Sequence, residues 1–174
     1  MTPEHSWDVR LIEAAEIEVA VVTGACTGAA FESVIDADLR LAGDAATFSC
    51  AGARDPIGCA RRLTRLLGEA RAKEIMLGER TFGAADALRL GLVTRVVPSS
   101  AIADAVRSLE DGLRALPPLA LRAVRDAVRA TRDLTPRAAL ELEHQQFRRL
   151  IATADHKAAV AAFFARREPA FTGE

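Results

Sequence analysis

The sequence predicts an α/β fold, with a mixed core in residues 17–98 and a helical region in residues 99–174. The first supporting observation is a run of small and β-branched residues, Val19–Thr23, followed by a glycine turn and then by helical spacing. The second is that apolar residues after residue 99 recur at helical spacing, with breaks at prolines. Half of the 174 residues are hydrophobic, which suffices for one core, so we expect a single domain over residues 1–174.

Residues 1–16 are predicted to form an N-terminal arm. Met1–Asp8 is polar and contains a proline, which is typical of a loose segment. Val9–Ala15 carries its apolar residues near helical spacing, which predicts a short helix leading into the strand at Val19. We therefore expect the folded core to begin at about residue 17.

The turn after this strand is the predicted functional site. Gly24 and Gly28 enclose the turn, and a short helix follows from Ala29. The first amide groups of a helix have no helical acceptors, and the helix dipole is positive at this end. The amides of Gly28, Ala29 and Ala30 can therefore stabilise a negatively charged oxygen. Strand alternation and helix spacing also predict a core around the turn, formed by Val19, Val21, Phe31, Val34, Ile35, Leu39 and Leu41.

Glu32 lies about one helical turn after Gly28, close enough to the same helix end for its carboxylate to act as an acid or a base on a bound group. A second interpretation is favoured by the residues taken alone. Glycine-rich turns between a strand and a helix are common in α/β proteins, and a glutamate near a helix start is often a solvated side chain favoured by the dipole. Both interpretations stay open, and the wider sequence context is needed to support a catalytic Glu32.

Glycines and prolines set the limits of the later elements. Gly68, Gly78 and Gly91 each follow a short segment with helical character. The expected elements are helices at 60–67, 70–77 and 84–90, a strand at 92–97, and helices at about 99–115, 118–132, 135–152 and 155–166. Thr135 is the expected N-cap of its helix, with Pro136 in the first turn.

Composition argues against several classes of partner. A formal net charge of −1 gives no reason to expect a nucleic acid or an anionic membrane. No apolar run approaches the roughly 20 residues that span a bilayer, and the N-terminus is polar where a signal peptide would be apolar, so we expect a cytoplasmic protein. Cys26, Cys50 and Cys59 lack metal-type spacing and the three histidines are scattered, so we expect reduced thiols and no metal site.

Several short motifs occur in a fixed order along the sequence. They are Thr23-Gly24, Gly28-Ala29-Ala30, Glu32, Asp38–Ala42, Arg62–Gly68, Ala84–Ala87, Gly91–Val93 and Val96–Pro98. This order resembles the enoyl-CoA hydratase/isomerase family, the crotonases, in which a strand ending in Asn-Gly precedes a glycine-rich turn, a glutamate and another strand. The resemblance covers nearly everything after residue 17 and is most specific in residues 84–98.

The resemblance implies a truncated crotonase-like ββα spiral with a helical C-terminal region. It covers the latter two thirds of full-length members, while their first third supplies part of the spiral, half of the oxyanion hole and much of the CoA wall. By the same resemblance, Gly28 and Ala29 supply oxyanion donors, Glu32 the acid or base, and Gly24 part of the substrate site. The contacts implied for the adenine or phosphates of CoA are Phe163, Arg166 and Arg167. The acyl-CoA or carrier-bound thioester is the expected substrate, and no cofactor is expected.

Two departures from the family bear on this expectation. Ala29 stands where the family usually has glycine, and its Cβ leaves less room for a thioester oxygen. The segment from Phe48 to Arg62 is shorter than in family hydratases and lacks the glutamate that serves as their second catalytic acid. Asp55 is the nearest acidic substitute, although Asp55-Pro56 is also a typical turn opening.

Two functions therefore stay open. In the first, the chain is a hydratase, dehydratase, isomerase or related lyase that stabilises an enolate or oxyanion of an acyl thioester. In the second, it is a catalytically degenerate homologue that acts as an accessory subunit. The resemblance also implies a homo-oligomer, a trimer or hexamer. Without the first spiral turns, the strand at Val19 becomes terminal, so its edge needs a cover from the arm, another subunit or another protein.

Overall fold

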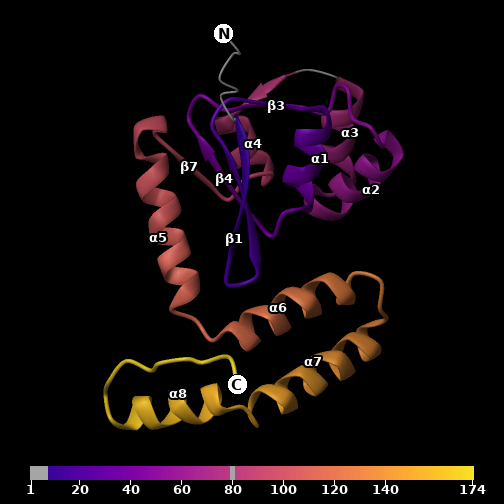
Figure 1. The fold of residues 1–174 in the computed structure, drawn as a ribbon. Coiled ribbons are helices and arrows are strands. Elements are labelled where there is room, and N and C mark those ends of the chain that lie inside the picture. The colour runs from indigo at the N-terminus through magenta and orange to yellow at the C-terminus, as the bar shows by residue number, and fades with distance from the viewer. Residues whose placement is uncertain (1–7, 79–80) are drawn as a thin grey trace. The chain divides into compact units, whose positions relative to one another are not determined.

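The structure is a computed structural model that describes residues 8–78 and 81–174. Its strands are β1 (Val9–Ala14), β2 (Ile17–Val22), β3 (Ala25–Thr27), β4 (Leu39–Gly43), β5 (Thr47–Ser49), β6 (Phe82–Gly83) and β7 (Arg95–Val97). Its helices are α1 (Gly28–Asp36), α2 (Pro56–Leu67), α3 (Glu69–Gly78), α4 (Ala84–Leu90), α5 (Ile102–Arg114), α6 (Pro118–Thr131), α7 (Pro136–Leu150) and α8 (Ala154–Phe164), with a 3₁₀ turn at Ser99–Ala101 (Figure 1). The predicted α/β class is confirmed.

Residue contacts divide the chain into two compact units. The first, the α/β unit, contains residues 8–13 and 18–107. The second, the helical unit, contains residues 108–174 together with residues 14–17. The border between these units falls at residues 107–108, within α5, and the predicted border between core and helical region at residues 98–99 stays a prediction.

The α/β unit contains a four-stranded sheet in the order β1-β2-β4-β7. β2 and β4 are parallel with Val19 opposite Leu39, and β4 and β7 are parallel with Leu41 opposite Arg95. In β2 every residue except Glu18 is buried. A strand buried along both of its faces is typical of a parallel sheet covered on both sides.

A three-stranded sheet in the order β3-β5-β6 carries the turn of interest. β3 and β5 are parallel with Cys26 opposite Phe48, and β5 and β6 are antiparallel with Phe48 opposite Phe82. The rings of Phe48 and Phe82 stack with centroids 5.8 Å apart. The sequence prediction missed β3 and β6, because three and two residues are too few to show a strand period.

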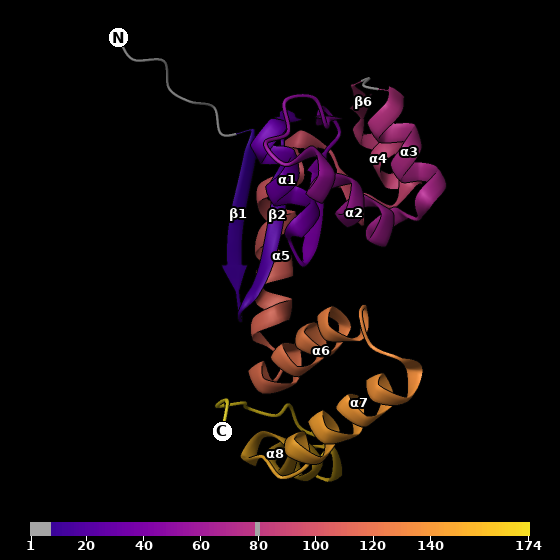
Figure 2. The same ribbon diagram turned by 90° about the vertical axis from the view of Figure 1, so that its right-hand side faces the viewer.

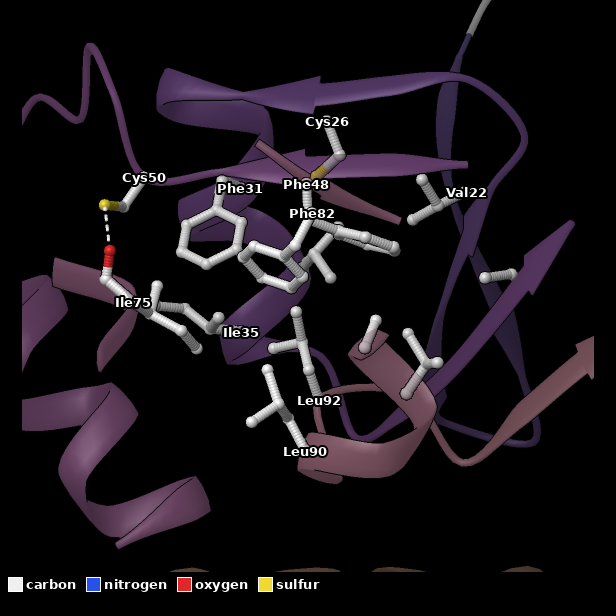
Figure 3. Packing of buried hydrophobic residues seen from close by; sticks show 14 of the residues in the cluster. Val22, Cys26, Phe31, Ile35, Phe48, Cys50, Ile75, Phe82, Leu90 and Leu92 are labelled. Carbon is white, nitrogen blue, oxygen red and sulfur yellow. Dashed lines mark hydrogen bonds between the residues drawn. The ribbon is translucent and has the colours of Figure 1, made fainter. Parts of the chain in front are cut away.

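The core around the start of α1 is only partly the predicted one: its buried cluster contains Phe31, Val34 and Ile35 with Ala20 and Val22 of β2, whereas Val19, Val21 and Leu41 are buried outside this cluster. Val19, Val21, Phe31, Val34, Ile35 and Leu41 are buried, and Leu39 is half-buried. Phe31 and Phe48, both fully buried, lie among the side chains drawn in Figure 3, where the Cys50 thiol donates to the Ile75 carbonyl oxygen at 3.4 Å. Burial of each such phenylalanine stabilises the fold by about 1.5–3 kcal/mol.

One expectation for the N-terminal region is wrong, and one of the alternatives for covering the Val19 strand is observed. Val9–Ala14 is strand β1, not a helix, because it pairs with β2 through the two-residue turn Ala15-Glu16 (Figures 1 and 2). The edge of the strand at Val19 is covered from within the predicted arm, one of the three expected alternatives, because β1 pairs with β2. Of the predicted arm, residues 1–7 lie outside the described residues.

The helical unit contains α6, α7 and α8, and its C-terminal segment folds back along α8 (Figure 1). The carboxylate of Asp155 accepts from the amides of Thr172 at 2.7 Å and Gly173 at 3.1 Å. Thr135 is the N-cap of α7, as predicted, and its hydroxyl accepts from the Ala138 amide. Within residues 8–78 and 81–174, no helix is both long and apolar enough to cross a bilayer.

Candidate functional site

Gly28, the first residue of α1, has a backbone that requires glycine. Its φ is 56°, a left-handed conformation, and a Cβ at this position would lie 2.9 Å from the carbonyl oxygen of Gly52. Its amide donates to the carbonyl oxygen of Ala51 at 3.0 Å. The Gly28 amide is therefore already occupied by the chain itself, which differs from the expectation that it would donate to a substrate oxygen.

Ala29 and Ala30 supply the next two amides of the helix start. Both residues are half-buried, and neither amide is hydrogen-bonded to an acceptor in the part of the chain that the structure describes. Amides in the first turn of a helix have no helical partner and lie at its positive end. Of the three candidate donors, the amides of Ala29 and Ala30 thus remain open and that of Gly28 does not.

Glu32 is bound on one oxygen by the loop that precedes α2. Oε1 accepts from the amides of Arg54 and of Asp55, the latter at 3.1 Å. Oε2 accepts from Arg62 Nη2 at 3.4 Å, a long contact. These hydrogen bonds, the Asp55 amide first among them, and the Arg62 charge lower the pKa of the Glu32 carboxyl from its ordinary value of 4.5. Glu32 is therefore a carboxylate anchored by one oxygen, with acceptor capacity left on the other.

Arg62 reaches Glu32 from α2 and also contacts a second carboxylate on α1. Its Nη1 donates to Asp36 Oδ2 at 2.7 Å. Asp36 is exposed, whereas Glu32 and Arg62 are half-buried. The cluster consequently joins α1 to α2 beside the open amide of Ala29.

Asp55 and Gly24, two further predicted site residues, have contacts that shape the backbone. Asp55 is the N-cap of α2, where its Oδ1 accepts from the Gly58 amide at 2.9 Å, so the predicted turn opening is present. Its amide is one of the two that bind Glu32. Gly24 donates to the Asp8 carbonyl oxygen at 3.3 Å, and a Cβ on Gly24 would collide with the Asp8 carboxyl group. Neither contact tests whether these residues also touch a substrate.

The three cysteines are free and buried, with none placed as a nucleophile. Burial raises the pKa of the Cys26 thiol to about 12 and that of the Cys59 thiol to about 11. Both are therefore neutral thiols at physiological pH. Among the described residues, no group of three histidine, cysteine or acidic side chains is placed to hold a metal ion.

The predicted CoA contacts belong to the helical unit. Phe163 is exposed on α8, where its ring meets that of Phe164 edge-on with centroids 5.6 Å apart. Arg166 and Arg167 follow the end of α8, are exposed, and Arg166 has a left-handed backbone with φ of 52°. Their contact with CoA stays a prediction.

Comparison with known proteins identifies the family of this chain. The family model for enoyl-CoA hydratase/isomerase matches residues 4–174. The chain belongs to the enoyl-CoA hydratase/isomerase family. It is 31% identical over 159 residues to the 2,3-dehydroadipyl-CoA hydratase of Escherichia coli K12, covering 89% of this chain and 62% of that protein. It is 31% identical over 163 residues to the (E)-benzylidenesuccinyl-CoA hydratase of Thauera aromatica, with 89% and 62% covered.

Solved structures of the family share its fold. An enoyl-CoA hydratase subunit I from Geobacillus kaustophilus HTA426 superposes with a TM-score of 0.81 at 33% identity, covering 88% of this chain and 62% of that one. An enoyl-CoA hydratase from Bacillus anthracis superposes with a TM-score of 0.80 at 27% identity, covering 86% and 60%. The predicted crotonase-like fold is confirmed. The chain spans 62% of the length of each of the two hydratases compared by sequence above.

The sequence prediction missed two sets of contacts around Glu32: those of the side chains of Asp36 and Arg62, and those of the main-chain amides of Arg54 and Asp55. The contacts of Asp36 and Arg62 could have been predicted from the sequence. Acidic residues four apart on α1 form one face, and an arginine on the next helix can contact them. The contacts of the Arg54 and Asp55 amides could not have been predicted, because nearly every residue carries the same main-chain N–H donor and the sequence does not mark which ones bind. Their position follows from the path of the loop between β5 and α2.

Proposed function

We propose that this chain is a crotonase-type enzyme that acts on an acyl thioester, with the Ala29 amide as oxyanion donor and Glu32 as the acid/base. The carrying observation is the asymmetric binding of Glu32. Oε1 holds two backbone amides, while Oε2 has only the 3.4 Å contact with Arg62. Because an ionised carboxylate offers about four acceptor positions, Oε2 can still accept a proton from a bound group.

The contacts that lower the pKa of Glu32 favour its ionised form. At neutral pH the side chain is ionised, so it starts as a base. It removes a proton from water that adds to the β-carbon, or from the α-carbon next to the thioester carbonyl. The displaced electron pair moves to the carbonyl oxygen, and an N–H aimed at that oxygen stabilises the resulting enolate. Protonated Glu32 then returns the proton to carbon, which completes hydration or isomerisation.

A glutamine in place of Glu32 tests this proposal. Glu32→Gln keeps the shape and the acceptor oxygen but removes the base, so turnover should fall by about a hundredfold to ten-thousandfold. The assay uses a panel of enoyl and 3-hydroxyacyl thioesters, carried by CoA and by acyl carrier protein. Glu143→Gln, an exposed glutamate on α7, is the matched control and should leave turnover unchanged. Equal rates for wild type and Glu32→Gln would remove the catalytic assignment.

An accessory subunit is the second candidate, and one observation favours it. The Gly28 amide and Glu32 Oε1 are occupied by residues of the loop between β5 and α2 rather than being free for a substrate. In that case the wild type turns over no thioester of the panel, while it changes the rate of a partner enzyme. Glu32→Gln would then leave that stimulation intact.

Binding of CoA and self-assembly belong to the same proposal. Phe163, Arg166 and Arg167 are the proposed adenine and phosphate contacts, and a trimer or hexamer is the proposed assembly. Calorimetry with acetyl-CoA should show weaker binding for Arg167→Ala than for the wild type, with Arg137→Ala on α7 as the control. Analytical ultracentrifugation gives the assembly, and a monomer across the micromolar range would contradict it.

A further inference from the structure

One guanidinium connects two carboxylates on the same face of α1. Glu32 and Asp36 are four residues apart, so their side chains lie one above the other on the helix and repel each other. Arg62 meets each with a different nitrogen, Nη2 on Glu32 at 3.4 Å and Nη1 on Asp36 at 2.7 Å. The planar fork of arginine suits this bridge, which a single ammonium group cannot reproduce.

The placement of Arg62 is specific on its own helix. Leu63, the next residue of α2, is fully buried, and Arg61 on its other side is exposed. The Arg62 side chain keeps 23% of its exposure, yet its Nε is buried and has no hydrogen-bond acceptor among residues 8–78 and 81–174. Since a buried donor without an acceptor is unfavourable, the two carboxylates are what hold the guanidinium in this position.

Resting on the proposed function above, we propose that Arg62 is a positioning residue for Glu32: it fixes the orientation of the carboxylate so that one acceptor position of Oε2 remains directed at the substrate. The amides of Arg54 and Asp55 restrain Oε1, and Arg62 restrains Oε2 from α2. Restraints on both oxygens lock the terminal torsion of glutamate, which is otherwise broad. A base held in one orientation is more often aligned with the proton that it removes from the bound substrate.

Arg62 also favours the ionised form of this base. The charged or titratable groups around Glu32 are Asp36 on α1, Arg54 and Asp55 on the loop, and Cys59 and Arg62 on α2. The Cys59 thiol is neutral because burial raises its pKa to about 11. Arg62 is the cation whose charge and side-chain hydrogen bond lower the pKa of Glu32, so its removal should raise that pKa.

Three variants separate orientation from charge. Arg62→Met removes both the charge and the fork, Arg62→Lys keeps the charge but loses the bridge, and Arg61→Met is the exposed control on the same helix. One readout is the ¹³C NMR titration of the Glu32 carboxyl carbon, assigned with Glu32→Gln. The other is the pH profile of kcat/KM for the best thioester of the panel.

We expect Arg62→Met to lower kcat by about tenfold to a hundredfold with KM within about twofold. Its Glu32 titration and the acidic limb of its pH profile should both move to higher pH, because the base then protonates more readily. Arg62→Lys should lower kcat similarly with a smaller movement of both titrations, and Arg61→Met should match the wild type. A loss of kcat in Arg62→Met with unmoved titrations would mean a merely structural role and overturn the inference, as would unchanged kcat and titrations.

The two proposals fail differently. If Glu32→Gln is fully active, the proposed function is wrong whatever Arg62 does. If Glu32→Gln is inactive while Arg62→Met behaves as Arg61→Met does, only the positioning role is wrong. If the wild type turns over nothing, the NMR titration still decides whether Arg62 holds the carboxylate. Should Arg62→Met fail to fold, as judged by circular dichroism, Arg62→Lys carries the same comparison.

Discussion

Replacing Gly28 by alanine tests the backbone geometry on which the site depends. The left-handed φ of 56° costs an L-residue about 1–2 kcal/mol. The new Cβ, 2.9 Å from the Gly52 oxygen, forces the loop away and weakens the hydrogen bond from the Gly28 amide to Ala51, a loss of about 0.5–1.5 kcal/mol. The lower entropy of the unfolded alanine chain offsets about 0.4–1 kcal/mol. The free energy of unfolding should therefore fall by about 2 kcal/mol.

Urea unfolding followed by circular dichroism measures this change. Gly112→Ala is the matched control, because Gly112 lies inside α5 with nothing in the described chain within 4 Å of an added Cβ. There the same substitution should raise the free energy of unfolding by about 0.5–1 kcal/mol, since glycine disfavours a helix interior. A loss below about 0.5 kcal/mol in Gly28→Ala would refute the reasoning, and so would the same sign of change in both variants.

Three more changes have defined outcomes. Ala15→Gly should raise the free energy of unfolding by about 0.5–1 kcal/mol in the same urea assay, because Ala15 has a φ of 51° in the hairpin turn; a decrease would contradict the turn geometry. Asp155→Ala should speed hydrogen exchange at the amides of residues 172 and 173, because they lose their acceptor at a cost of about 1–3 kcal/mol. The control Glu168→Gln should leave this exchange unchanged. Equal exchange in the two variants would contradict the hydrogen bonds from these amides to Asp155. Cys26 and Cys59, with raised pKa values, should resist a thiol reagent at pH 8 in the folded protein and react after denaturation, and rapid labelling of the native protein would show them accessible.

Sequence patterns predicted the elements that repeat a period several times. α4 has the predicted bounds, and α3, α6 and α7 differ from theirs by one or two residues at either end, because their apolar spacing is closed by glycine or proline. Val9–Ala14 was mistaken for a helix, since six residues can satisfy a helical and a strand period alike. What decided its conformation was pairing with β2, a contact that no local pattern contains.

The candidate site was predicted unevenly for a related reason. Glu32 and the glycine turn were recognisable because side-chain identity and spacing mark them. The occupation of the Gly28 amide by Ala51 was not, since it depends on where a six-residue connection from β5 to α2 runs in space. Sequence names the groups at a site, whereas main-chain contacts decide which of them remain free to bind.

The anchoring of Glu32 couples proton uptake to the hold between α1 and the loop. The folded pKa of this carboxyl lies below its ordinary 4.5, so the stability it contributes is fully present above that value and is lost as pH falls through the folded pKa. The same linkage applies to the proposed reaction. When Glu32 takes a proton from the substrate, the acceptor for the amides of Arg54 and Asp55 loses its charge, and their hydrogen bonds weaken. In the proposed reaction, the loop before α2 is thus held most tightly while Glu32 is ionised and least tightly while Glu32 carries the proton.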